Sequence, residues 1–194
     1  MQPSTGLLSL NVMRPRIDVS DRALAQEFLN GSEAAFRQLY QRHTPRMRGV
    51  VLRLLRGACD AGNAGNAADD ADDVVQETWL RASAALERFR WESTLFTWLC
   101  GIGVHAALEV LRRNRRWVDD EALDQVAATD PPPGEGIDMS TALAALPSRQ
   151  RAVMVLHDVE GYTHDEIAVL LGIVPGTSKS QLTHARNAVR RALR

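Results

Sequence analysis

A strip of acidic and proline-rich sequence, residues 118–140, constrains the fold of this 194-residue chain more than any other feature. It holds seven Asp and Glu residues and no Lys or Arg, and its centre reads PPPG. Proline cannot continue a helix, and like charges that repel one another cannot form a core. We therefore predict a flexible acidic linker between two separate units, residues 21–117 and 141–194, with residues 1–20 as a flexible N-terminal tail.

Composition favours an all-α fold, with two small helical domains on either side of the linker. Aromatic residues make up 5% of the chain and hydrophobic residues 45%, while Ala, Leu and Arg are plentiful. No uninterrupted apolar run reaches the roughly 18 residues of a membrane-spanning helix, and no basic segment precedes the apolar patch near the N-terminus. We expect a cytoplasmic protein without a signal peptide. Two lone cysteines, Cys59 and Cys100, make neither a disulfide framework nor a metal site.

Charge is distributed so that two mildly basic units flank the acidic strip. Residues 1–117 carry 16 Arg against 13 acidic residues, and residues 141–194 carry seven basic against four acidic residues. Two interpretations of the strip stay open at this point. It is either a solvated interdomain loop or a polyanion that occupies a channel built for nucleic acid.

The segment from about residue 68 to 89 is predicted to be a helix with two distinct faces. One face is an apolar core stripe at helical spacing: Val75, Thr78, Trp79, Ala82 and Leu86. The other face gathers polar side chains around an apolar one: Asp69, Asp73, Gln76, Glu77 and Leu80. Acids in a first turn suit the helix dipole, but the dipole does not explain an exposed leucine among them. Such a face is typical of a protein-binding surface, and a calcium loop would need a Gly and a terminal Glu that are missing.

Residues 89–117 hold five of the chain's ten aromatic residues, with arginines around them. Basic groups neutralise phosphates and aromatic rings stack on unpaired bases, so the mixture suits single-stranded or melted nucleic acid. Phe96 and Trp98 are predicted to be core residues. Arg90 and Trp91, in a turn before the next helix, are better ligand candidates. The run RRNRR at residues 112–116 is also compatible with a solvated helix end.

The C-terminal unit shows a compact two-helix pattern. Thr163 and Glu166 form a capping box at the start of the first helix, and Gly172 ends it. A second helix is predicted to start near Thr177, with a polar and basic outer face: Lys179, Ser180, Thr183, His184, Arg186, Asn187 and Arg190. This arrangement is a helix-turn-helix, whose second helix would enter the major groove. An αα-hairpin that merely packs is the alternative.

Together these segments resemble a known family. DADDVVQETWLRA followed by FRWESTLFTWL is similar to the polymerase-binding and promoter-melting segment of bacterial extracytoplasmic-function sigma factors, in the sigma-70 family. LPSRQRAVMVLHDVEGYTHDEIAVLLGIVPGTSKSQLTHAR resembles that family's C-terminal helix-turn-helix. The resemblance covers roughly residues 22–194. It implies a factor that binds core RNA polymerase and directs promoter-specific transcription initiation, and that is not itself an enzyme.

The resemblance assigns three sets of site residues. Six match the helix that binds the polymerase clamp: Asp70, Asp72, Asp73, Gln76, Glu77 and Leu80. Nine fall in the segments that would engage the −10 element, where the turn from Arg88 to Ser93 resembles a loop that captures a flipped base: Arg88, Arg90, Trp91, Ser93, His105, Arg112, Arg113, Arg115 and Arg116. Six match positions that contact the −35 element: Thr177, Lys179, Ser180, Thr183, His184 and Arg186.

The resemblance also implies partners. They are core RNA polymerase, through the clamp helices of its β′ subunit and through its β flap, promoter DNA, and an anti-sigma factor of a kind often anchored in the membrane. The acidic linker would thread toward the polymerase active-site channel and mimic nucleic acid there. No cofactor, metal or small-molecule substrate is expected.

Three residues depart from the family pattern. Many relatives carry a basic residue and an alanine where this chain has Gly101 and Gly103, and each glycine weakens a helix by about 1 kcal/mol relative to alanine. His184 stands where relatives often carry Arg or Lys, and histidine is mostly neutral at pH 7. These departures keep open a sigma-like decoy that binds polymerase without opening DNA.

Two further classes of protein are compatible with parts of the pattern. A stand-alone helix-turn-helix regulator would need the basic second helix but not the acidic face around Leu80. A metal-dependent phosphohydrolase would use the acids at residues 69–73 with His105 or His164. No His–Asp pair at ligand spacing and no Gly-rich phosphate loop supports that enzyme.

Overall fold

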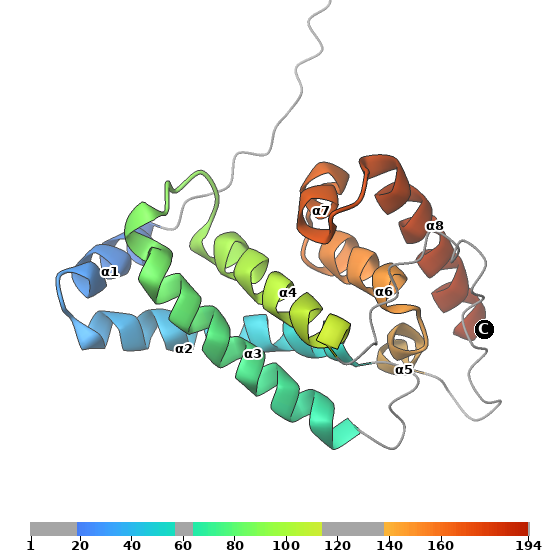
Figure 1. Ribbon diagram of the computed structural model, residues 1–194, viewed down its shortest axis with the longest axis horizontal. Helices are drawn as coiled ribbons and strands as arrows, with labels where there is room; N and C mark the ends of the chain where they lie inside the picture. The colour runs from blue at the N-terminus through green and yellow to red at the C-terminus, as the bar shows by residue number, and fades with distance from the viewer. Residues whose placement is uncertain (1–18, 57–63, 114–137, 194) are drawn as a thin grey trace, which may run out of the picture.

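The computed structural model describes residues 19–56, 64–113 and 138–193, and every regular element in these ranges is a helix (Figure 1). The N-terminal unit contains α1 (Val19–Leu29), α2 (Glu33–Leu55), α3 (Ala64–Ala85), a 3₁₀ turn (Leu86–Arg88) and α4 (Leu95–Arg113). The C-terminal unit contains α5 (Met139–Ala144), α6 (Ser148–Met154), a π-helical turn (Val155–Val159), α7 (His164–Leu171) and α8 (Pro175–Ala192). The predicted all-α fold is confirmed, and α5 already begins within the strip predicted as linker.

The N-terminal unit is built on the mutual packing of α2, α3 and α4, and α1 packs against α2. The stripe predicted on α3 is the face that packs, because Val75, Thr78 and Trp79 are all buried. Gly31 and Ser32, residue types that favour turns, form the turn between α1 and α2. Gly31 has φ 96°, and the Ser32 side chain accepts a hydrogen bond from the Ala35 N–H at 3.3 Å.

Local signals in the sequence misplace three helix starts in this unit: Ser20 or Asp21 is the N-cap candidate for the first helix, Pro45 is the candidate first residue of a later one, and the third was predicted from about residue 68. Pro45 lies inside α2, because the apolar stripe continues through it and buries Met47 and Val50, which offsets the roughly 3 kcal/mol cost of proline. α1 begins at Val19, so Asp21 is not a cap but a buried carboxylate paired with α2. α3 begins at Ala64 rather than near residue 68, and Ala67 is buried.

The C-terminal unit has the predicted helix-turn-helix. Thr163 and Glu166 make both hydrogen bonds of the capping box, and Gly172 closes α7 in the left-handed conformation at φ 67°. α8 begins at Pro175, two residues before the predicted start, because proline at the first helical position lacks only an N–H that would have no partner in the helix.

The two units lie against each other, with α6 and α7 beside α2 and α4 (Figure 1). Buried residues of both units belong to one hydrophobic cluster, in which Leu156 and Ile167 join Leu54 and Leu99. Among the described helices, α4 is long and apolar enough to cross a membrane by length and composition, but 56% of that stretch is buried inside the protein. It is the helix shared by the bundle and by the second unit.

Candidate protein and nucleic-acid interfaces

The predicted protein-binding face of α3 is exposed to solvent. Leu80 is 68% exposed, and the side chains of Asp72, Asp73, Gln76 and Glu77 are exposed around it, while Asp70 is half-buried. Because α3 begins at Ala64, none of these acids lies in its first turn, and the helix dipole fades within that turn. The dipole therefore does not account for the cluster, and the interpretation as a protein surface is strengthened.

The opposite side of α3 fixes the direction in which this face points. Trp79 is buried, its Nε1–H donates to the Thr44 hydroxyl at 2.9 Å, and the Phe36 ring meets its ring edge-on at 5.5 Å. Thr78 is fully buried and donates to the Val74 carbonyl at 2.7 Å. An aromatic ring held by a hydrogen bond and a ring contact resists rotation of the helix.

Two arginines hold carboxylates on this face in place. Arg48 of α2 binds Asp72 through two nitrogens, with Nη2 and Oδ2 at 3.1 Å, and this hydrogen bonding lowers the pKa of Asp72. Arg81 bridges Glu77, at 2.8 Å, and Glu109 of α4, at 3.0 Å, and lowers the pKa of Glu109. These bonds keep Asp72 and Glu109 ionised at neutral pH.

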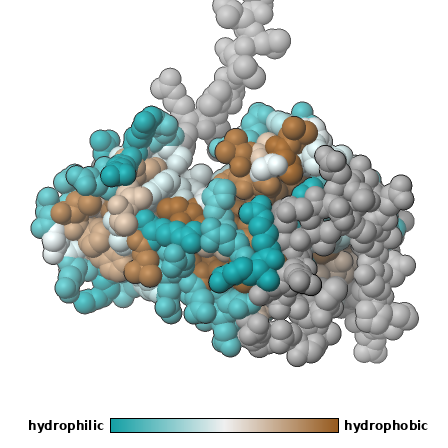
Figure 2. All heavy atoms as spheres, in the orientation of Figure 1, coloured by the Kyte–Doolittle hydropathy of each residue, from teal (hydrophilic) through white to brown (hydrophobic). Residues whose placement is uncertain are grey.

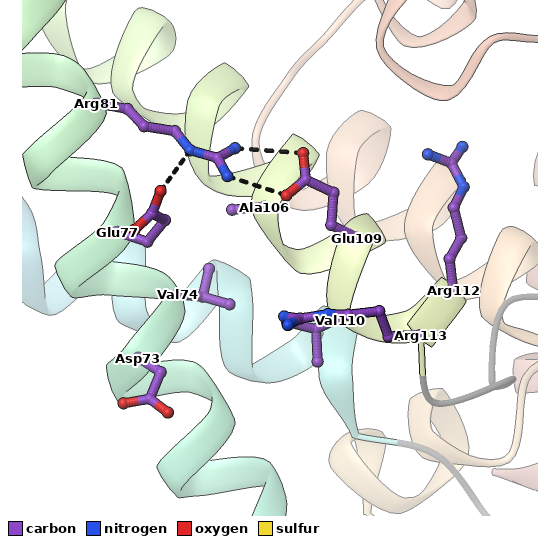
Figure 3. A pocket seen from close by; sticks show the side chains of 9 residues that line it. All are labelled: Asp73, Val74, Glu77, Arg81, Ala106, Glu109, Val110, Arg112 and Arg113. Carbon is purple, nitrogen blue, oxygen red and sulfur yellow. Dashed lines mark hydrogen bonds and ion pairs between the residues drawn. The ribbon is translucent and has the colours of Figure 1, made fainter.

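A groove of about 620 Å³ separates α3 from α4 beside this face (Figure 3). Arg81 spans it, and Arg113 reaches back across Val110 toward α3, whereas Arg112 points away. Neither Arg81 nor Glu109 was predicted as a site residue from the sequence. The four-residue spacing of Glu77 and Arg81 on one helix was the available signal, but nothing local indicated Glu109.

The turn before α4 places the predicted −10 residues next to an aromatic cluster. Arg88 and Arg90 are exposed, and Ser93 is half-buried. Trp91 has φ 58°, and its ring lies half-buried, 4.8 Å from Phe89, with the Arg22 guanidinium 5.8 Å above it. Trp91 is thus held between neighbours, and any base that stacks on it would use the remaining exposed part of its ring.

The two residues of this segment that were predicted as core, Phe96 and Trp98, pack against it. Trp98 is half-buried and stacks on Phe89 with centroids 4.7 Å apart. Phe96 packs against the core and lies under the Arg46 guanidinium at 4.1 Å. Farther along α4, the remaining −10 candidates in the described residues are exposed: His105, Arg112 and Arg113. Arg115 and Arg116 lie outside the described residues, as do residues 118–137 of the predicted linker.

The two glycines of α4 have separate structural roles. A Cβ on Gly103 would lie 3.3 Å from the Thr78 hydroxyl and 3.6 Å from Val51, so glycine permits α4 to approach α2 and α3 closely. A Cβ on Gly101 would meet the Leu170 side chain of α7 at 3.8 Å. Gly103 is therefore a packing residue, and Gly101 lies where the C-terminal unit contacts α4.

The second helix of the helix-turn-helix presents its predicted contacts to solvent. Lys179, Ser180, Thr183 and His184 are exposed on α8, and Thr177 is half-buried. Their orientation is fixed from behind by buried residues, among them Ser178, whose hydroxyl meets His164 Nδ1 of α7 at 2.9 Å. A polar bond between two helices in an otherwise apolar contact specifies their register.

Among the −35 candidates, Arg186 forms an ion pair with another residue of the protein. Its Nε and Nη2 bind Asp158 of the π-helical turn at 2.9 and 2.6 Å. Hydrogen bonding to Arg186 lowers the pKa of Asp158. No pattern in the sequence indicates this pair, because its members are 28 positions apart and lie in different helices.

The three predicted sets lie on different elements of the structure. The polymerase set lies on α3, the described −10 set lies on the turn 88–93 and along α4, and the −35 set lies on α8. Figure 2 shows hydrophilic side chains over the N-terminal part of α3 and the adjoining part of α4, and a hydrophobic patch over α7, where Val169 is 81% exposed. Within the described ranges, no group of three His, Cys, Asp or Glu side chains is placed to hold a metal ion.

Comparison with protein families gives two matches in chain order. The family described as Sigma-70 region 2 matches residues 39–117, and the family described as Sigma-70, region 4 matches residues 137–189. The ECF RNA polymerase sigma factor SigM of Mycobacterium tuberculosis is 31% identical over 195 residues, which covers 100% of this chain and 94% of the relative. The RNA polymerase sigma factor CarQ of Myxococcus xanthus is 30% identical and covers 79% of this chain and 86% of its own.

Solved structures agree with these matches. The sigma factor RpoE in complex with the anti-sigma factor NepR from Bartonella quintana has a TM-score of 0.57 and 26% identity, covering 81% of this chain and 96% of that one. CnrH in complex with the cytosolic domain of CnrY has a TM-score of 0.56 and 26% identity, covering 90% of this chain and 97% of that one. The matches and the order of the helices lead to one assignment: the chain belongs to the extracytoplasmic-function sigma factors of the sigma-70 family.

Proposed function

We propose that this chain binds core RNA polymerase through the exposed face of α3 and then directs initiation at promoters with its own −10 and −35 sequences. One observation carries the polymerase-binding step. Leu80 is 68% exposed at the C-terminal end of an acidic face, on a helix whose opposite face packs into the core through Trp79. An exposed apolar residue bordered by charged ones is typical of a protein interface.

The charged rim points to a basic partner surface. Glu77 and Asp73 lie about one and two turns N-terminal to Leu80 on the same face of α3, and Arg81 binds the Glu77 carboxylate at 2.8 Å. Clamp helices of the polymerase β′ subunit with an apolar patch and basic neighbours would complement this face. Leu80 then supplies the buried area, and the carboxylates supply orientation and the rate of encounter.

Promoter opening is assigned to the turn before α4 and to α4 itself. Arg88 and Arg90 would neutralise phosphates, and Trp91 would stack on a base that leaves the duplex, with Ser93 as its hydrogen-bonding neighbour. His105, Arg112 and Arg113 would continue this path along α4 toward the arginines at 115 and 116. RNA synthesis itself stays with the polymerase.

Reading of the −35 element is assigned to the N-terminal half of α8. Lys179 would bind a phosphate or a guanine, and Ser180, Thr183 and His184 would contact neighbouring groups in the major groove. Arg186, bound to Asp158, would orient α8 and contact a phosphate only from that fixed position. Thr177 completes the set at the helix start.

Anti-sigma control is part of the proposal. Both solved neighbours above are complexes, one with the anti-sigma factor NepR and the other with the cytosolic domain of CnrY. An anti-sigma partner, anchored in the membrane or free, would hold this chain until a signal releases it. The site of action would be the cytoplasm, where polymerase and promoter DNA are found, and the β flap of the polymerase would receive the C-terminal unit.

Run-off transcription with core polymerase on a genomic fragment library tests this function. The wild-type chain should bind polymerase and give new promoter-specific transcripts. Leu80→Asp should reduce both by tenfold or more, whereas Leu29→Asp, at a 43% exposed position on α1, should leave both unchanged. Binding without transcripts would favour the decoy, and absence of binding would favour a stand-alone helix-turn-helix regulator.

A further inference from the structure

The first turn of α1 lies against the turn that precedes α4. Arg22, in that first turn, places its guanidinium over the Trp91 ring, 5.8 Å from the ring centroid. Helix α1 also packs on the 3₁₀ turn Leu86–Arg88, which leads into the same segment. A residue outside the predicted −10 set therefore lies directly over the ring that is proposed to receive a base.

Contacts with α2 hold Arg22 in this position. The neighbouring Asp21 is only 3% exposed and pairs with Arg42. Its Oδ2 also lies 2.8 Å from His43 Nε2. Leu24, half a turn beyond Arg22, is buried in the core. A buried polar contact together with an apolar one specifies the register of a helix, so α1 keeps Arg22 beside the turn before α4.

Trp91 is held from below in an unfavourable backbone conformation. Its φ is 58°, the one positive φ of a non-glycine residue in the part of the chain that the structure describes. A bulky residue keeps such a conformation only where its neighbours hold it, and such residues gather at ligand sites. The Phe89 ring lies 4.8 Å from the Trp91 ring and itself stacks on Trp98 at 4.7 Å. These rings hold the half-buried Trp91 ring at the surface next to Arg22.

The arginines around Trp91 are available to phosphates. Arg22 and Arg88 are exposed, and neither forms an ion pair with a carboxylate of the described residues. Arg90 meets Glu92 only at 3.9 Å, between side chains that are 83% and 77% exposed. In contrast to the paired arginines on α2 and α3, these cations can displace counterions from a nucleic-acid strand.

We propose that Arg22 closes over a base that stacks on Trp91, so that the two side chains hold one unpaired base of the melted promoter strand between them. This inference rests on the proposed function of the turn before α4. Two stacking distances of about 3.4 Å would place the guanidinium about 6.8 Å from the ring below the base. The observed separation is 5.8 Å, so an opening of about 1 Å admits the base, and an exposed arginine can supply it by rotating about its own bonds.

A guanidinium suits the upper side of this site through both its shape and its charge. It is planar and stacks on aromatic faces, while its N–H groups point outward in the plane of the group, toward the phosphates on either side of the captured nucleotide. Lysine would supply the charge but no planar face. Because every base has a π-face, the pair of Arg22 and Trp91 would strengthen capture without choosing among the bases.

Substitutions at two exposed arginines test the site. Arg22→Lys keeps the charge and removes the planar face, and Arg22→Met removes both. The matched control is Arg37→Met, which removes one charge from an exposed arginine of α2 that has no ion-pair partner among the described residues. Both positions lie on helix surfaces, so all three variants should keep the helical content of the wild type in circular dichroism.

Binding of the free chain to a labelled single-stranded thymidine oligonucleotide, measured by fluorescence anisotropy at low ionic strength, separates stacking from charge. We expect Arg22→Lys to weaken binding about threefold and Arg22→Met about fivefold or more, whereas Arg37→Met should weaken it by no more than about twofold. Equal affinities of Arg22→Lys and the wild type would reduce Arg22 to a point charge and overturn the proposal. Equal affinities of Arg22→Met and Arg37→Met would also overturn it.

A promoter fragment that carries 2-aminopurine at single positions of its melted −10 strand tests capture in the polymerase complex. Stacking on an aromatic ring quenches this fluorescent base, so the wild type should quench one position more than its neighbours. Arg22→Lys should remove roughly half of that quenching at unchanged affinity for core polymerase. Quenching that Arg22→Lys leaves unchanged would overturn the inference alone. Absence of promoter-specific transcripts would instead overturn the proposed function, and the oligonucleotide measurement would still decide whether Arg22 and Trp91 hold a base.

Discussion

Alanine substitutions at the two glycines of α4 should have opposite effects on stability. At Gly101 a new Cβ would make an ordinary contact, 3.8 Å from Leu170, so Gly101→Ala gains helix propensity of about 0.8–1 kcal/mol with little cost. At Gly103 the same Cβ would lie 3.3 Å from the Thr78 hydroxyl. That hydroxyl is fully buried and already bonded to the Val74 carbonyl at 2.7 Å, so it cannot move without losing the bond.

The magnitude at Gly103 follows from two opposing effects. Overpacking a buried contact costs about 1–3 kcal/mol, which exceeds the gain in propensity, so we expect Gly103→Ala to lower the free energy of unfolding by about 0–2 kcal/mol. For a chain of this size, each kcal/mol shifts the melting temperature by about 2–4 °C. Urea unfolding followed by circular dichroism measures both variants on the same scale.

A double-mutant cycle isolates the contact between α4 and α3. Thr78→Ala removes the hydroxyl that the methyl group introduced by Gly103→Ala would press against, so the two changes together should be less destabilising than their sum by about 0.5–2 kcal/mol. If Gly103→Ala stabilises the protein as much as Gly101→Ala, or if the cycle shows no coupling, the close approach of α4 to α3 is not as the structure has it.

Three other predictions concern charge and reactivity. Burial, followed by nearby basic groups on His157, Lys179 and Arg186, lowers the pKa of His164. The unfolded chain therefore binds a proton at this imidazole more readily than the folded chain, so the free energy of unfolding should fall as pH drops through about 6.5. His164→Gln should flatten this dependence in unfolding curves measured from pH 7.5 to 5. Arg81→Met should raise the pKa of Glu109 toward its ordinary value in an NMR titration. It should lower the free energy of unfolding by at most about 1 kcal/mol, since both side chains are largely exposed. An unchanged pKa of Glu109 would contradict the ion pair with Arg81. Burial raises the pKa of Cys100 to about 12, so its thiol should resist alkylation at pH 8 until the chain unfolds, and rapid labelling of native protein would contradict its placement.

Local periodicity predicted those parts of the fold that depend on neighbours along the chain. The α3 stripe, the Thr163 capping box and the Gly172 stop each depend on one short stretch of sequence, and all were predicted as observed. Pro45 and the start of α3 failed for the opposite reason. In both places local propensity argues against a helix, and packing against other helices outweighs it.

Contacts between distant segments could not be predicted from the pattern. Arg151 reaches a carbonyl 97 positions earlier, and Arg186 binds a carboxylate 28 positions away. Nothing in the sequence distinguishes these two arginines from arginines that contact only solvent, because an arginine in an amphipathic helix is normally solvated. The same limit applies to the face around Leu80, whose residues were identified locally but whose anchoring by Thr44 was not.

Several arginines of this chain bind carboxylates within the protein, which leaves fewer of them available to DNA phosphates. Its 23 Lys and Arg residues suggest a strong electrostatic attraction, but the net charge is −1 and several arginines bind carboxylates within the protein. Arg46, Arg48 and Arg81 are engaged in the N-terminal unit, and Arg186 in the C-terminal unit. Affinity for phosphates scales with the number of cations free to displace counterions, so this chain alone would have little non-specific affinity. Promoter recognition would then depend on polymerase to hold both units along the DNA, and the α3 face proposed to bind polymerase is exposed while the two units lie against each other.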